Sequence, residues 1–242
     1  MMHLSFPHIP QWLCNTLLVP SLFFCGQAAT LAGSAPEAAV VEVVSVFEEP
    51  SHHIILANDR LSVYRVDIQA TEDSRTLYHY HENDQLTVLT LDSSGFDQRL
   101  GGTAERFQAP AGTLLFTSYS AEKALPHQIL VPAGEQFGVI GIEFSGPPST
   151  RFEKRYSAPT ESDFEIPQAQ VRRLQFEGDE TLHPNSLLVS LGNYTLNLEK
   201  QGATTIWKAK RGDVHWVDSR ASPGVISTVS PARLIVVTLK PR

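Results

Sequence analysis

Apolar and polar residues alternate with a period of two along most of the chain after about residue 40. The alternation is clear at 61–68 (LSVYRVDI), 85–91, 112–116 and 136–144 (QFGVIGIEF). A period of two is typical of β-strands that bury one face, whereas a helix would give a period near 3.6. Glycine, proline, aspartate and asparagine separate these runs, as they do in β-sandwiches and small barrels. The pattern therefore predicts an all-β protein.

A second group of strands follows an interruption at 146–167. The interruption is rich in proline, serine and charged residues, and it is predicted to be a linker. The strands beyond it are predicted at 169–176, 182–191, 194–199, 204–208, 213–218, 224–230 and 233–239. The two groups are weak repeats of each other, as in 112–116 (GTLLF) and 212–216 (GDVHW). A repeat of roughly 100 residues predicts two tandem barrels and not a solenoid of short units.

Residues 1–28 have features of a secretory signal peptide. An apolar stretch at 12–25 (WLCNTLLVPSLFFC) is followed by Gly26 and Ala28, in the small-x-small pattern of a cleavage site. The stretch is too short to span a bilayer of about 30 Å. No lysine or arginine precedes Arg60, unlike most signal peptides, so a buried N-terminal helix or a short anchor is the alternative. We expect an N-terminal extension at 29–47, no membrane span after cleavage, and a periplasmic or extracellular protein.

The composition is typical of a folded protein, and it excludes cysteine as a metal ligand in the predicted mature chain. Apolar residues make up 42% of the 242 residues and charged residues 19%, which suits a globular domain and argues against disorder. Both cysteines, Cys14 and Cys25, lie in the predicted signal peptide, so a metal in the mature chain needs nitrogen and oxygen ligands. The net charge of −7 makes nucleic acid and anionic membranes poor partners.

The densest group of candidate ligands lies at 77–85 (LYHYHENDQ). His79 and His81 are two positions apart on a predicted strand, so their side chains project from the same face. Neutral imidazole is a common ligand of first-row transition metals. His127, at the start of a later predicted strand, is the candidate third ligand. A barrel whose interior histidines bind sugar or water, without a metal, is the alternative.

Other polar residues near this group have simpler interpretations. His52 and His53 precede a predicted strand and are expected in a turn or at the surface. The candidates for the mouth of a barrel are Tyr64, Arg65, Arg106 and Glu143, although polar residues on strands are usually solvated.

The segment at 77–85 resembles the first sequence motif of the cupin family, G-x5-H-x-H-x3,4-E-x6-G. His79 and His81 match its two histidines, and Pro126-His127 resembles the second motif. The upstream sequences EEPSHH and ANDRLSV also resemble a group of exported bacterial cupins. The resemblance implies that residues 48–145 form a jelly-roll barrel, or double-stranded β-helix, which binds one transition-metal ion.

The chain departs from the first motif at the metal-binding glutamate. Gln85 occupies that position under the shorter spacing, and Asp84 is the alternative if the strand carries a bulge. A glutamine is neutral, binds a metal more weakly than a carboxylate and cannot act as a general base. The ligands implied by the resemblance are His79, His81, Gln85 and His127.

The second half keeps the repeat but not the ligands. It has His183 without an H-x-H pair, and Gly224 occupies the position that corresponds to His127. His215, on a predicted strand, is interpreted as a structural residue. We therefore expect 168–242 to form a degenerate second cupin-like barrel that covers a sheet edge or forms an interface, with a homodimer among the possible assemblies.

Two functional hypotheses follow from the resemblance, beside a structural one. The first is a metal-dependent enzyme of the dioxygenase, decarboxylase or isomerase type, using Fe, Mn, Ni, Cu or Zn on a small organic molecule. The second is a non-catalytic module that binds a sugar, an organic acid or a metal. The third is a partner-binding protein with a vestigial site, in which the histidines would not converge.

Overall fold

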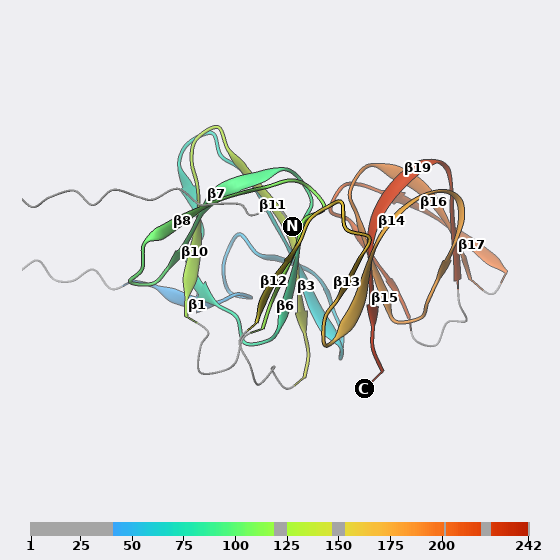
Figure 1. The fold of residues 1–242 in the computed structure, drawn as a ribbon, viewed down its shortest axis with the longest axis horizontal. Helices are drawn as coiled ribbons and strands as arrows, with labels where there is room; N and C mark the ends of the chain where they lie inside the picture. The colour runs from blue at the N-terminus through green and yellow to red at the C-terminus, as the bar shows by residue number, and fades with distance from the viewer. Residues whose placement is uncertain (1–40, 119–124, 147–152, 201, 219–223, 242) are drawn as a thin grey trace, which may run out of the picture. The chain divides into compact units, whose positions relative to one another are not determined.

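The structure is a computed structural model that describes residues 41–118, 125–146, 153–200, 202–218 and 224–241 (Figure 1). Every regular element in these ranges is a β-strand, which confirms the predicted all-β class. The predicted signal peptide, with Cys14 and Cys25, and most of the predicted extension at 29–47 lie outside the described residues. Within these ranges no helix has the length and apolar character needed to cross a membrane.

The first barrel is built from two sheets. Its strands are β1 (Val43–Ser45), β2 (His53–Ala57), β3 (Leu61–Gln69), β4 (Ser74–Arg75), β5 (Tyr78–Tyr80), β6 (Gln85–Leu89), β7 (Ser93–Arg99), β8 (Ala104–Ala109), β9 (Leu114–Thr117), β10 (His127–Val131), β11 (Gln136–Phe144) and β12 (Lys154–Ser157). One sheet has the order β1-β5-β10-β7-β8, with β4 also pairing with β10. The other has the order β12-β9-β6-β11-β3-β2.

The second barrel repeats this arrangement with fewer, longer strands. They are β13 (Asp163–Glu165), β14 (Ala169–Leu182), β15 (Ser186–Ser190), β16 (Tyr194–Lys200), β17 (Ala203–Ala209), β18 (Val214–Val217) and β19 (Gly224–Leu239), coloured from yellow-orange to red in Figure 1. The order β18-β15-β19-β14 matches β9-β6-β11-β3 of the first barrel.

Two long strands differ from the sequence prediction. Strand β14 continues past residue 176, and β19 joins the two strands that were predicted at 224–230 and 233–239. The register between them shifts at Phe176/Gly178, where Gly178 adopts a φ of 91°. The pairing of the two strands resumes on the other side of this irregularity, so the ladder is interrupted there but does not end.

The internal repeat is also visible in one pair of turns. Gly112 and Gly212 have φ values of 85° and 79°, which glycine adopts readily. The amide of Gly112 donates to the carbonyl of Leu89 at 2.8 Å, and that of Gly212 donates to Ser190 at 2.7 Å. Each glycine thus closes the turn that leads into the matching strand, β9 or β18.

The two barrels share a hydrophobic core. Strands β6, β9 and β11 contribute Leu86, Leu114 and Ile140, and β15 and β19 contribute Leu187 and Val237. Alternate residues of β6 instead face the interior of the first barrel, so the strand is buried on both sides. Burial of one such side chain contributes about 1.5–3 kcal/mol, so this layer is a main source of stability.

The predicted linker at 146–167 contains two strands in its described part. Strand β12 pairs with β9 of the first barrel, and β13 pairs with β14 of the second. Arg155 of β12 lies over the rings of Phe116, in β9 of the first barrel, and Phe164, in β13 of the same segment. The charge and proline content that predicted a linker did not reveal these contacts.

Arg173 on β14 fixes the segment between the two strands. Its Nε donates to the carbonyl of Gly112 at 3.2 Å, its Nη1 to Glu161 at 2.8 Å and its Nη2 to Ser157 at 2.9 Å. One half-buried guanidinium therefore joins the segment to both barrels.

Replacing Arg173 by alanine is expected to lower the free energy of unfolding by about 3 kcal/mol, because three carbonyl groups lose a charged donor. Urea denaturation measures this change. The control is Arg172→Ala on the same strand, where we expect a change within about 0.5 kcal/mol. Equal losses in the two variants would contradict the assigned role.

Candidate metal centre

Three histidines from distant parts of the first barrel meet inside it. His79 lies in β5, His81 follows that strand directly, and His127 is the first residue of β10. The backbone register pairs His127 with His79. One ring nitrogen from each histidine lies within 4.8 Å of the others. His79 and His81 are each 2% exposed, so the group sits below the protein surface.

The Nδ1 atom of each imidazole is held by a hydrogen-bond acceptor. His81 Nδ1 lies 2.8 Å from Oε1 of Glu143, and His127 Nδ1 lies 2.8 Å from Oδ1 of Asp97. His79 Nδ1 lies 3.0 Å from the carbonyl oxygen of Leu77. A carbonyl can only accept, so His79 carries its ring proton on Nδ1, and His127 and His81 do the same when Asp97 and Glu143 are ionised. Each Nε2 then presents a lone pair, as in histidine metal sites.

The Nε2 atoms of His81 and His127 are 3.2 Å apart. Two lone pairs at this distance repel each other unless a proton or a cation lies between or beside them. Two nitrogens that bind one ion at about 2.1 Å each, roughly 100° apart, have this separation. The donor set therefore fits a first-row transition metal.

Burial keeps the imidazoles of His79 and His81 neutral. Desolvation, helped by the nearby His127 and His52, lowers the pKa of His79 to about 3. Desolvation also lowers the pKa of His81 far below its usual value. Metal binding requires the unprotonated ring, so neutral histidines at pH 7 carry no proton that a metal would have to displace.

Glu143 is the buried carboxylate behind His81. It is 1% exposed, and Nδ2 of Asn83 also donates to it, at 3.2 Å. Desolvation raises the pKa of Glu143 to about 7. A cation bound at His81 would favour its ionised form, because opposite charges nearby stabilise a carboxylate.

Gln85 and Asp84 lie on opposite faces of the same sheet. Gln85 lines the interior of the first barrel, and its Nε2 donates to the hydroxyl of Tyr64. The ring of Tyr64 lies over Gly141, where an added Cβ would come within 2.0 Å of it. Asp84 instead accepts a hydrogen bond from Nε2 of Gln168 at 2.5 Å, and it is not among the residues that line the cavity.

A fourth histidine lies next to the three. His52 is only 9% exposed, its Nδ1 is 2.5 Å from Glu49, and its ring centroid is 4.6 Å from that of His79. Burial would raise the pKa of Glu49, but hydrogen bonds from His52, Leu77 and Ser51 hold it below its ordinary value. The turn prediction for His52 identified its local structure and missed its burial.

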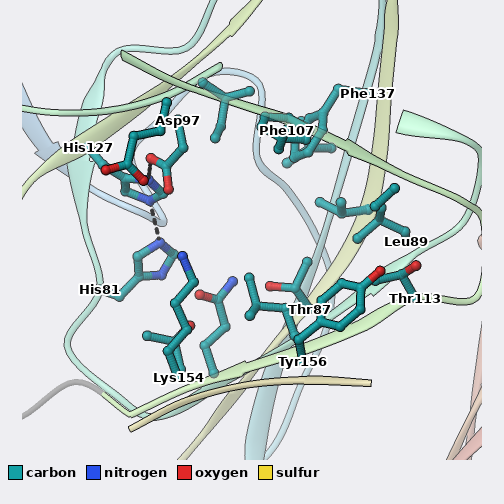
Figure 2. A pocket seen from close by; sticks show the side chains of 18 of the residues that line it. His81, Thr87, Leu89, Asp97, Phe107, Thr113, His127, Phe137, Lys154 and Tyr156 are labelled. Carbon is teal, nitrogen blue, oxygen red and sulfur yellow. Dashed lines mark hydrogen bonds and ion pairs between the residues drawn. The ribbon is translucent and has the colours of Figure 1, made fainter. Parts of the chain in front are cut away.

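A cavity of about 660 Å³ opens from the histidines into the barrel. Figure 2 shows His81 and His127 at one end and Leu89, Phe107 and Phe137 at the other. The cavity thus has a polar end with candidate metal ligands and an apolar end, as is usual for small-molecule sites. Its remaining lining residues include Thr87, Asp97, Arg99, Glu105, Arg106, Thr113, Leu115, Thr117, Ile129, Val139, Lys154 and Tyr156.

The second barrel has an apolar interior at the matching positions. Its register pairs Leu182 with Gly224, as the first barrel pairs His79 with His127. Leu182 is buried in a hydrophobic cluster that also includes Phe176, Leu196 and Ile226. His183 is exposed, and His215 packs against Trp207. Among the described residues, the histidine group of the first barrel is the sole metal-ligand cluster.

Several residues of the site had weak signals in the sequence. Asp97 and Lys154 occur in strands of ordinary polar character, and only pairing across the sheets brings them to the histidines. Glu143 had been a candidate for the barrel mouth, and the structure places it behind His81. Glu143 lies opposite Gln85 on the neighbouring strand, so the two side chains project from the same face. The alternation of residues along β11, which predicts the face on which Glu143 lies, is the sequence signal that could have been used.

Solved structures show the same fold at low sequence identity. YhaK from Escherichia coli has a TM-score of 0.52 and 13% identity, over 74% of this chain and 85% of YhaK. The bacterial pirin YhhW in complex with nickel(II), also from Escherichia coli, has a TM-score of 0.52 and 15% identity, over 78% of this chain and 91% of that one. Both are cupin-fold proteins, so the chain has the cupin fold. No protein-family model and no curated protein matches the sequence.

In the metal-free protein, replacing His79 by leucine is expected to flatten the pH dependence of stability. The pKa of His79 falls from 6.5 in the unfolded chain to about 3 in the fold, so the unfolded state binds the extra proton between these values. Stability is then lost as pH falls below 6.5, by about 1.4 kcal/mol per pH unit for this one group.

Urea denaturation in EDTA at pH 4.5, 5.5 and 6.5 measures this slope, and leucine is the residue that the second barrel has at the paired position. A slope unchanged by His79→Leu would show that His79 titrates normally in the fold.

Proposed function

We propose that the first barrel binds one divalent transition-metal ion through Nε2 of His79, His81 and His127, and acts on a small organic molecule in the adjoining cavity. One observation carries the proposal: two buried histidines and the partly buried His127 present Nε2 to a common point while their Nδ1 atoms are all engaged. Fe, Mn, Ni, Cu and Zn all accept imidazole ligands, so this donor set is compatible with each.

The metal would supply Lewis acidity and open coordination positions for an oxygen donor. The protein's own groups have separate tasks. Glu143 and Asp97 orient His81 and His127, and the apolar end of the cavity holds the body of the substrate away from water. Gln85 and the Tyr64 hydroxyl form a neutral hydrogen-bonding pair beside the histidines.

The amide side chain of Gln85, at the position where the cupin motif has a glutamate, bears on which reaction type we propose. An isomerisation that moves a proton between carbon atoms needs a general base, and an amide cannot serve as one. We therefore favour a dioxygenase or decarboxylase type of reaction over an isomerase type. The same neutral residue favours the alternative function, a non-catalytic module that binds a small molecule or a metal. Turnover, or its absence, in metal-loaded protein separates these two functions.

The wild-type protein is expected to bind one metal ion per chain, and His79→Ala is expected to lower its affinity at least about 100-fold, because one of three protein ligands is lost. Elemental analysis after dialysis and a zinc titration measure stoichiometry and affinity. His183→Ala is the matched control, since this exposed histidine lies in the second barrel. Absence of bound metal in the wild type would refute the proposal.

Glu143→Gln and Asp97→Asn are each expected to reduce metal affinity about 10- to 100-fold, because each neutral amide no longer fixes the orientation and proton of its histidine. Competition with a chromophoric chelator measures the change. Glu105→Gln, which alters a cavity carboxylate that has no bond to a histidine, should leave affinity within about twofold. Wild-type affinity in both first variants would show that the ligands orient without these carboxylates.

A further inference from the structure

The segment between the barrels contributes two side chains to the cavity of the first barrel. Strand β12 pairs with β9 at the edge of the sheet β12-β9-β6-β11-β3-β2. Both Lys154 and Tyr156 on β12 line the cavity. Arg155, between them, points the other way and lies over Phe116 and Phe164. Since successive residues of a strand face opposite sides, Lys154 and Tyr156 share the face of β12 that lines the cavity, where both side chains are also exposed to solvent.

Lys154 belongs to a row of polar residues across four strands. The register pairs Lys154 with Thr117, Thr117 with Gln85, and Gln85 with Glu143. Residues directly opposite each other on neighbouring strands project from the same face. The row therefore runs from the cavity rim at Lys154 to Glu143, which holds His81.

A second cation approaches from the facing sheet. Arg99 on β7 is the cross-strand partner of His127 and lines the same cavity. Figure 2 shows the side chain of Lys154 extending from β12 toward the end that holds His81 and Asp97.

The charges that line the cavity leave these two cations available. Asp97 is bonded to His127, and Arg106 is paired with Glu135 at 2.8 Å. Within the described part of the chain, no carboxylate forms an ion pair with Lys154 or Arg99. With Arg106 paired to Glu135, the other charged residues that line the cavity are the cations Arg99 and Lys154 and the carboxylates Asp97 and Glu105, of which Asp97 is already bonded to His127.

A divalent ion held by His79, His81 and His127 would add positive charge at this end of the cavity, because imidazole and amide ligands are themselves neutral. An anion bound at this end would therefore interact favourably with the ion and with both side chains. The apolar end, with Leu89, Phe107 and Phe137, suits the uncharged body of the same molecule.

We infer that the cavity binds small carboxylates with an apolar body, and that Lys154, delivered by the segment between the barrels, recognises the carboxylate together with Arg99. This inference rests on the proposed function, because it assigns the substrate class of the same site. Lys154 is a specificity residue here, and the apparent linker is part of the binding site.

A matched pair of probes, phenylacetate and phenylacetamide, tests the inference by calorimetric titration of zinc-loaded protein. We expect phenylacetate to bind about tenfold more tightly, since an ionised acceptor forms the stronger contact with an ammonium group. Lys154→Met should remove most of this preference, and Lys154→Arg should retain it. Lys208→Met, on exposed strand β17 of the second barrel, should leave it unchanged.

The zinc content of every variant is measured first, so that failure of the metal centre is distinct from failure of this inference. Protein that takes up no zinc would refute the proposed metal centre, and the two probes would then be compared on metal-free protein, where the effect of Lys154→Met must persist. Equal binding of the two probes, or a preference that survives Lys154→Met, would overturn the inference.

Discussion

The hydrogen bonds on the outer side of the histidines determine what the site can do. An imidazole can present either nitrogen, and the acceptors at Nδ1 decide that Nε2 faces inward. This arrangement needs two buried or half-buried carboxylates, which are costly to desolvate unless they are hydrogen-bonded. Glu143 and Asp97 reach these positions because the two sheets of the barrel place β11 behind His81 and β7 beside His127. The barrel thus fixes the direction and the protonation of its candidate ligands together.

The sequence could predict the fold class and the three histidines, but not their surroundings. Period-two alternation and the H-x-H spacing are local, and Pro126-His127 resembles a known motif, so His79, His81 and His127 could be found without coordinates. Lys154 and Asp97 could not, because their roles depend on which strands pair and in which register. The burial of His52 was missed for a related reason. A residue in a turn was expected to be exposed, whereas His52 is buried with its ring against that of His79. Export, the domain boundaries and a homodimer stay predictions from the sequence.

The second barrel shows how a site of this kind can be replaced. Leu182 and Gly224 take the paired positions of His79 and His127, and a continuous apolar cluster fills the interior. The two halves share the order of four central strands and the glycine turn at Gly112 and Gly212. The difference between a polar cavity and a packed core therefore lies in a small set of inward-facing side chains, as expected when function is carried by sites that a fold supports.

The hydrophobic layer between the barrels explains why the half without ligands persists. Residues such as Leu86, Leu114 and Ile140 are buried only because β15 and β19 cover them. A protein that contained only the first barrel would expose the apolar face of this sheet to water, and a large exposed apolar face promotes self-association. The second barrel therefore has a structural role that does not depend on ligands of its own, because it covers the apolar face of the sheet that carries β6, β9 and β11.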